Sequence, residues 1–148
     1  MTLLVNTIAS PLQVGVYQNE KLHERYIEEG KTSDVLLPLL MKLLQRYPVS
    51  RIVYARGPGS YMAIKLTYVT LKSIEVVQGI PCFGCSAFTL NNNQPVKAMG
   101  NLYFIKEKET IITKKFDTPV EAAFVLPQSI QDLEIDEESA PAYLLPAV

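Results

Sequence analysis

The stretch of this chain best suited to chemistry is a glycine-rich turn, Gly57-Pro58-Gly59-Ser60. Glycine adopts backbone angles that other residues avoid, proline pre-sets one turn dihedral, and serine is a favoured N-cap of a helix. An apolar run precedes the turn and a long apolar-rich segment follows it, which predicts a strand, a tight turn and a helix. Such a turn points several free N–H groups at one place, so Gly57, Gly59 and Ser60 are candidate phosphate-binding residues. The simpler interpretation, which we favour for so short a motif, is that the turn only reverses the chain.

The two cysteines and the single histidine offer little further chemistry. Cys82 and Cys85 form a C-x-x-C motif, but a zinc site needs two more good ligands and His23 is the only histidine. A redox C-x-x-C opens a helix, whereas this motif lies in a stretch typical of a strand, where residues three apart point to opposite faces. We therefore expect structural cysteines. We expect no catalytic residue and no metal site, since Ser60 has no identifiable base or orienting acid.

The composition describes an ordinary globular chain. Of its 148 residues, 48% are hydrophobic and 20% are charged, which indicates one domain, or one domain with an incomplete second. The formal net charge of -1 argues against a dedicated nucleic-acid binder, which usually shows a basic face. The N-terminus lacks the pattern of a signal peptide, and the apolar run over residues 35–44 is too short and too interrupted to span a membrane. We expect a cytoplasmic protein without membrane contact.

The glycine-rich turn is expected to lie within an alternation of strands and helices. Three strands with short connections come first, and strand–helix crossovers follow. Thr32 or Ser33 can cap the first helix, and Gly79 can end the second. The predicted strands cover residues 3–8, 12–17, 22–28, 51–55 and 81–85. The first predicted helix starts within residues 30–34 and runs to about Arg46, and the second covers residues 61–78. The order β-β-β-α-β-α-β predicts an α/β fold with a mixed sheet and helices on its faces.

A polar run over residues 91–95 has the composition of a linker, so we divide the chain into residues 1–90 and residues 91–148. The second part is short and resembles an incomplete subdomain. Its weaker patterns predict a hairpin over residues 101–106 and 109–116 and a strand over residues 121–126. They also predict an acidic stretch over residues 132–138, either a solvated loop or a frayed helix, and an edge strand over residues 142–145.

The two predicted helices carry unusual surfaces. The first is apolar almost all round, so it needs cover on two sides, from its own core and from either a larger domain or a partner. The second carries small side chains at Ala63, Thr67, Thr70 and Ser73, spaced by three and four so that they share one face. Small side chains on a helix allow another helix to approach closely.

Several stretches, in one order and at similar spacing, resemble the TsaB (YeaZ) family. The family's central pattern is close to GRGPGSFTGLR, and the stretch from Ala55 to Lys65 is ARGPGSYMAIK. Other matching stretches are the opening LLVNT, TSDVLLP from Thr32, KSI from Lys72, GIP from Gly79 and GCSA from Gly84. The resemblance covers about residues 2–90. It implies the ribonuclease-H-like half-domain of the actin-like ATPases, followed by a truncated second subdomain.

The chain also departs from the family pattern. Asn6 stands where the family has an aspartate, which in the actin-like superfamily approaches metal and phosphate; an amide cannot supply that charge. Ala63 replaces a family glycine, and Lys31 or Thr32 stands where a histidine is common. These departures speak against nucleotide turnover by this chain and leave a scaffolding role intact.

The resemblance implies a non-catalytic partner subunit that binds and stabilises TsaD. In the family, TsaD and the ATPase TsaE are partners in placing a threonylcarbamoyl group on the tRNA adenosine next to the anticodon. The tRNA would mainly touch the other subunits. The same surface can form homodimers when the subunit is alone. The resemblance implies no cofactor of the chain's own, with ATP possible at the partner interface.

The resemblance also indicates which residues make the contact. In the family, two helices of the first subdomain form a four-helix arrangement with the partner. We expect an apolar ridge from Leu36, Leu40 and Leu44, and a close approach of the partner helix at Ala63, Thr67 and Thr70. Lys65 and Lys72 match basic positions of the family and could hold acidic groups of the partner or a nucleotide phosphate.

Two other functions remain open. One is a small actin-like ATP-binding phosphotransferase or ATPase that uses the glycine-rich turn for phosphate, although Asn6 speaks against it. The other is a homodimeric interaction protein that covers its apolar helix with a second copy.

Overall fold

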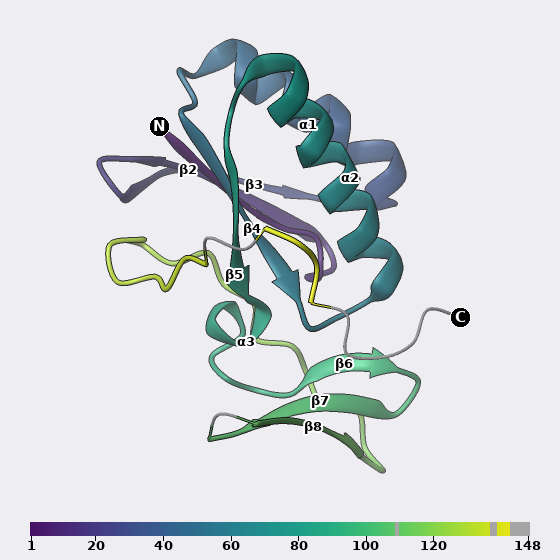
Figure 1. The fold of residues 1–148 in the computed structure, drawn as a ribbon. Helices are drawn as coiled ribbons and strands as arrows, with labels where there is room; N and C mark the ends of the chain where they lie inside the picture. The colour runs from purple at the N-terminus through teal and green to yellow at the C-terminus, as the bar shows by residue number, and fades with distance from the viewer. Residues whose placement is uncertain (109, 137–138, 143–148) are drawn as a thin grey trace.

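The computed structural model describes residues 1–108, 110–136 and 139–142. A five-stranded mixed sheet, ordered β3-β2-β1-β4-β5, organises the first part of the chain (Figure 1). β1, β2 and β3 pair antiparallel, while β4 pairs parallel with β1 and with β5. The strands are β1 (Thr2–Asn6), β2 (Leu12–Gln18), β3 (Lys21–Glu28), β4 (Arg51–Gly57) and β5 (Cys82–Ser86). This arrangement confirms the element order expected from the sequence, with strand ends shifted by at most two residues.

Two helices, α1 (Thr32–Arg46) and α2 (Tyr61–Gln78), lie side by side across one face of this sheet (Figure 1). Helix α1 starts within the predicted segment and ends at Arg46 as expected, and α2 keeps its predicted bounds. The predicted caps of α1 are wrong: the N-cap is Lys31, without a side-chain cap bond, because the main-chain N–H groups of Asp34 and Val35 donate to the Lys31 carbonyl. The predicted end of α2 is confirmed, since Gly79 caps it in the left-handed region at φ +69°.

The other face of the sheet is covered by α3 (Ala87–Leu90) and by an irregular segment, residues 124–135. Leu126 and Ile130 of this segment pack on Leu4 and Val53 of the sheet. Hydrogen bonds hold the segment in place, for example from the Tyr17 hydroxyl to the carbonyl of residue 127 at 2.7 Å. The central strands β1 and β4 are therefore buried on both faces, whereas the edge strand β3 keeps exposed side chains.

The strand predicted over residues 121–126 is wrong, because these residues form no strand. Their apolar side chains fill the core from an irregular backbone, which a pattern of apolar residues cannot distinguish from a half-buried strand. Of the edge strand predicted over residues 142–145, Ala142 is in no strand and the remainder lies outside the described residues. The acidic stretch is irregular over residues 132–136, as expected, apart from one bridge between Asp136 and Gly84.

A second, three-stranded antiparallel sheet follows, ordered β6-β7-β8. Its strands are β6 (Val96–Met99), β7 (Leu102–Glu107) and β8 (Thr110–Lys115), so the predicted hairpin is confirmed and β6 is an addition. Phe104 and Val96 pack against Phe88 of α3, which joins this sheet to the first one. The small size of the sheet agrees with a short second part, while the division at residue 90 stays a prediction.

Candidate functional site: an apolar groove between two helices

The outward side of the helix pair exposes large apolar side chains. On α1, Leu37 is 49% exposed and Met41 is 37% exposed, and on α2 Val69 is 53% exposed. Near the end of α2, Val76 and Val77 are more than 80% exposed. A hollow of about 280 Å³ lies between the helices, lined by Leu37, Met41, Val69, Thr70, Ser73, Ile74, Val77 and Gln78. We call these residues the helix groove.

The helical repeat explains why the groove is apolar. Leu36, Leu40 and Leu43 lie on one stripe of α1 and pack in the core above the sheet. Leu37 and Met41, four residues apart, form the next stripe and face outward beside α2. Because the leucine-rich segment carries apolar residues on both stripes, one stripe fills the core and the other is left at the surface.

The structure corrects the predicted apolar ridge. Leu36 and Leu40 are 1% and 0% exposed and belong to the chain's own core, and Leu44 is half-buried against that core. The stripe that carries the most leucines is the one that packs on the sheet, because burying it removes the most apolar surface from water. The neighbouring stripe could have been found in the sequence by asking which apolar residues remain once that stripe is assigned inward.

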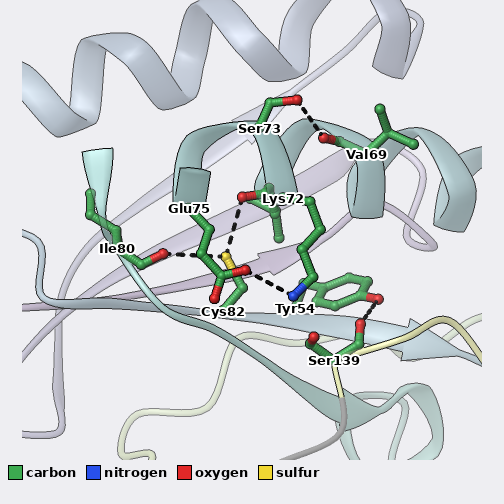
Figure 2. A network of polar contacts seen from close by, with 9 residues as sticks. Tyr54, Val69, Lys72, Ser73, Glu75, Ile80, Cys82 and Ser139 are labelled. Atoms are coloured by element: carbon green, nitrogen blue, oxygen red, sulfur yellow. Dashed lines mark hydrogen bonds and ion pairs between the residues drawn. The ribbon is translucent and has the colours of Figure 1, made fainter. Parts of the chain in front are cut away.

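The predicted small-residue face divides between the core and the groove. Thr67 is 1% exposed, and its hydroxyl lies 2.6 Å from that of Thr7 and donates to the Ala63 carbonyl at 2.7 Å. Thr67 is therefore buried against the end of β1 and cannot meet a partner directly. Thr70 and Ser73 line the helix groove, and the Ser73 hydroxyl donates back to the Val69 carbonyl (Figure 2).

The two predicted lysines already have partners within the chain. Lys72 Nζ donates to a Glu75 carboxylate oxygen at 2.8 Å and lies over the ring of Tyr68, as Figure 2 shows for the ion pair. The hydrogen bond to Glu75 raises the pKa of Lys72, so its ammonium form is favoured. Lys65 lies 5.8 Å from the ring centroid of Tyr61. Neither lysine lines the helix groove, so a salt bridge to a partner would form at its margin.

The glycines of the turn are explained by the packing of the chain on itself. Gly57 has a φ of +134°, and a Cβ there would lie 2.7 Å from the carbonyl oxygen of Ala142. A Cβ at Gly59 would lie 2.8 Å from Cγ2 of Ile8. At Gly57 the backbone and the positive φ exclude a side chain, whereas at Gly59 a side chain would require Ile8 to shift. Ser60 takes the expected N-cap position of α2, but its side chain makes no cap hydrogen bond.

A cavity of about 360 Å³ lies beside this turn, between the first sheet and the second. Its polar side chains include Ser10, Ser60 and Lys97, and the rest of its lining is mainly apolar. No carboxylate belongs to this lining. Phosphate binding at Gly57, Gly59 and Ser60 therefore stays a prediction, for which this cavity is the available space.

Asn6 serves the local turn. Its side chain is fully buried, and its Oδ1 accepts hydrogen bonds from the N–H groups of Ile8 and Ala9 at 3.1 and 3.2 Å. Its Nδ2 has no hydrogen-bond partner among the described residues. Within the same part of the chain, no group of three or more histidine, cysteine, aspartate or glutamate side chains could hold a metal ion.

The two cysteines point to opposite faces of β5, as their spacing predicts. Cys82, drawn in Figure 2, packs in the helix-side core, and its thiol approaches the Leu71 carbonyl at 3.4 Å. Cys85 packs on the other face. Burial raises the pKa of Cys82 to about 11 and that of Cys85 to about 12. Protonated, separated thiols are suited to packing rather than to redox or metal chemistry.

Comparison with known proteins identifies the fold. No family model matches the chain, and no curated protein matches its sequence. The solved structure of YeaZ from Pseudomonas aeruginosa is similar with a TM-score of 0.59 and 12% identity, over 78% of this chain and 64% of that one. A structure described as an uncharacterized protein with similarity to peptidase YEAZ from Pseudomonas aeruginosa has a TM-score of 0.58 and 12% identity, over 81% of this chain and 70% of that one.

This likeness confirms the predicted fold class. The chain has a YeaZ-like fold, a half-domain of the actin-like and ribonuclease-H-like type built on a mixed sheet. It spans 64% of the length of the first Pseudomonas aeruginosa structure, less than two thirds. Among the described residues, no helix is long and apolar enough to cross a membrane.

Proposed function

We propose that this chain is a divergent TsaB-like subunit that docks on TsaD through the helix groove and stabilises it during threonylcarbamoyl modification of tRNA. The observation that carries the proposal is an exposed apolar groove between α1 and α2 on a YeaZ-like fold. TsaD supplies the transfer chemistry in this proposal and TsaE the coupled ATP hydrolysis. This chain supplies a surface, and any ATP binds at or near the shared interface.

The shape and chemistry of the groove suit a helical partner. Leu37 and Met41 on one wall and Val69 and Val77 on the other are apolar, while Ser73 on α2 is small. A partner helix that lies along this groove would bury these side chains, and the small residue would allow its backbone to come close. Two helices from the partner would complete the four-helix arrangement.

The alternatives differ in what they require of the molecule. A homodimer would cover the same helix groove with a second copy. This alternative is preferred if the chain dimerises with itself and does not bind TsaD. A phosphotransferase or ATPase would use the cavity beside Ser60, but the lining of this cavity holds no carboxylate for a metal ion, and the nearby chain has an Asn6 amide instead of a charged side chain.

Gel filtration with light scattering, on the chain alone and mixed with TsaD from the same source, tests the proposal. We expect a peak of heterodimer mass that replaces any homodimer. Val69→Asp should weaken the heterodimer about tenfold or more, because it places a charge in the groove. The matched control is Val125→Asp, since Val125 is 59% exposed and lies outside the groove, whereas Val69 is 53% exposed.

Thr70→Trp provides a second, steric variant, because the indole would fill the groove that Thr70 lines. A complex that tolerates both Val69→Asp and Thr70→Trp would show that TsaD binds elsewhere. Separate peaks in the mixture, repeated with ATP and TsaE present, would overturn the proposal.

A further inference from the structure

The cavity beside the glycine-rich turn, called the intersheet cavity below, has the size and lining of a small-molecule site. Its volume of about 360 Å³ falls within the roughly 300–1,000 Å³ that is usual for ligand pockets. Its lining includes Ile8 after β1, Phe124 of the irregular segment and Val96 of β6. The lining is mainly apolar, which suits the hydrocarbon part of a ligand.

Two hydrophobic cores meet at this cavity. Ile8 and Phe124 pack against the core on the face of the first sheet away from α1 and α2, and also against the core around Phe88. Val96 belongs to the second of these cores and is 1% exposed. Its strand, β6, is the strand of the second sheet that lies toward the first sheet (Figure 1). A ligand with a hydrocarbon body would therefore contact both cores and remove apolar surface from water.

Hydrogen bonds from one cross-strand pair hold two walls of the cavity. Asn6 and Gln13 are directly opposite each other where β1 pairs with β2. Asn6 Oδ1 accepts from the main-chain N–H of Ile8 at 3.1 Å, and Gln13 Nε2 donates to the Phe124 carbonyl at 3.0 Å. Both amides are anchored in the sheet, so the main chain of each wall is fixed in advance. A ligand that enters would pay little to order these walls.

The polar groups of the cavity favour a negatively charged group. Lys97 and Tyr103 are directly opposite each other on β6 and β7, and both line the cavity. Lys97 is exposed and forms no ion pair with the described residues. The Tyr103 hydroxyl accepts from the Val120 N–H at 3.2 Å, and no described residue accepts its own proton. Because Tyr103 is 3% exposed, an acceptor oxygen from a ligand would satisfy a buried donor.

The same lining does not suit a nucleoside triphosphate. Phosphates carried with Mg²⁺ need carboxylate ligands for the metal and several cations for the remaining charge. The lining contains one cation, Lys97, and no carboxylate. A single negative charge on an apolar body matches these groups better.

We propose that the intersheet cavity binds a small apolar carboxylate, that is, a compound with an aromatic or branched hydrocarbon body and one carboxylate. The body packs against Ile8, Val96 and Phe124, and the carboxylate accepts from Lys97 and Tyr103. This site goes beyond the proposed docking to TsaD and shares no residue with the helix groove. Failure of one proposal therefore leaves the other untouched.

The test is a titration of the full chain with 2-naphthoate, followed in the ¹H–¹⁵N spectrum of the backbone amides. We expect saturable shifts at Ile8, Val96 and Phe124, and none at Leu37 and Met41 of the helix groove. The uncharged 2-naphthamide has the same ring and should bind about fivefold more weakly or worse. No saturable shift up to about 5 mM 2-naphthoate would overturn the proposal.

Variants separate the charge from the apolar lining. Lys97→Met should remove the preference for 2-naphthoate over 2-naphthamide, and as a surface change it should leave the fold intact. The matched control Lys106→Met removes the same charge from an exposed residue of β7 outside the cavity, and should change binding less than about twofold. Equal effects of the two variants would overturn the assignment of the carboxylate to Lys97.

A competition experiment tests the class of ligand. ATP with Mg²⁺ should not displace 2-naphthoate, because the lining offers no carboxylate for the metal. Displacement by ATP at a similar concentration would show that the cavity takes polyphosphates, and would overturn the assignment to an apolar carboxylate. Ala98→Leu should weaken the binding of both naphthalene compounds, because Ala98 lines the cavity and the larger side chain takes up its space.

Discussion

Several side chains in this protein have a structural role where their positions in the sequence suggest a binding role. Asn6 stands at the end of β1 with its Oδ1 committed to two main-chain N–H groups of the following turn. Gly57 and Gly59 make room for Ala142 and Ile8 instead of serving only the turn itself. A residue's type therefore limits what it can do, and its neighbours decide which of those options it uses.

The cysteines lead to a prediction at this scale. The pKa of Cys82 is raised to about 11 and that of Cys85 to about 12, against an ordinary value of 9.0. The folded state therefore keeps protons that the unfolded state loses, so stability is unaffected below pH 9 and falls as the pH rises from about 9 toward 11 and 12. Urea unfolding from pH 7 to pH 10.5 measures this fall.

The same thiols should react with a disulfide reagent at pH 8 only when the protein unfolds, because the thiolate is the reactive form and both are buried. The double variant Cys82→Ala with Cys85→Ala is the control for the pH effect, and it should lose less stability at high pH. Rapid labelling of the folded protein would contradict this account.

At the scale of elements, one hydroxyl pair links α2 to the end of β1. Thr7 and Thr67 are 6% and 1% exposed, and their Oγ1 atoms lie 2.6 Å apart. A buried hydrogen bond of this kind helps to set the distance between α2 and the end of β1, and hence the position of the helix groove. The two residues are 60 positions apart in the sequence, so no local sequence pattern predicts this hydrogen bond.

Thr67→Val should reduce the free energy of unfolding by about 1–2 kcal/mol, because it removes the shared hydroxyl and leaves that of Thr7 poorly paired. Thr70→Val is the control, since Thr70 is partly exposed in the groove, and it should change stability by less than about 0.5 kcal/mol. Urea unfolding followed by circular dichroism measures both. An equal loss of stability in the two variants would mean that the hydrogen bond between Thr7 and Thr67 does not contribute specifically to stability.

At the scale of the whole molecule, an irregular segment completes the protein. Residues 124–135 form neither helix nor strand, yet Leu126 and Ile130 seal the second face of the sheet. The strands under this face, β1 and β4, are buried on both sides, which is the usual condition of parallel strands. The segment should therefore unfold together with the sheet and not before it.

Leu126→Ala should destabilise the entire chain by about 2–4 kcal/mol, because Leu126 is 4% exposed against the sheet. The neighbouring Val125 is 59% exposed, so Val125→Ala should cost less than about 0.5 kcal/mol. Tyrosine fluorescence and far-ultraviolet circular dichroism should show coincident unfolding of the Leu126 variant. Two separate unfolding transitions would mean that residues 124–135 unfold independently of the sheet.

The sequence alone determined most of the architecture of the first part. Apolar runs of strand length, two long helical segments and the stops at Gly79 and at the residues before Pro48 are local signals, and all of these elements formed where they were expected. The opposite orientation of Cys82 and Cys85 also followed from the two-residue repeat of a strand.

Only the tertiary structure decided which surfaces remain available. Apolar side chains lie on two stripes of α1, and contact with the sheet buried the stripe with Leu36 and Leu40 and left Leu37 and Met41 for the groove. The irregular segment and residues 139–142 present carbonyl groups to side chains far away in the chain, such as Tyr17 and Arg56. Such contacts leave no periodic pattern in the sequence, because they depend on which distant segments the fold brings together.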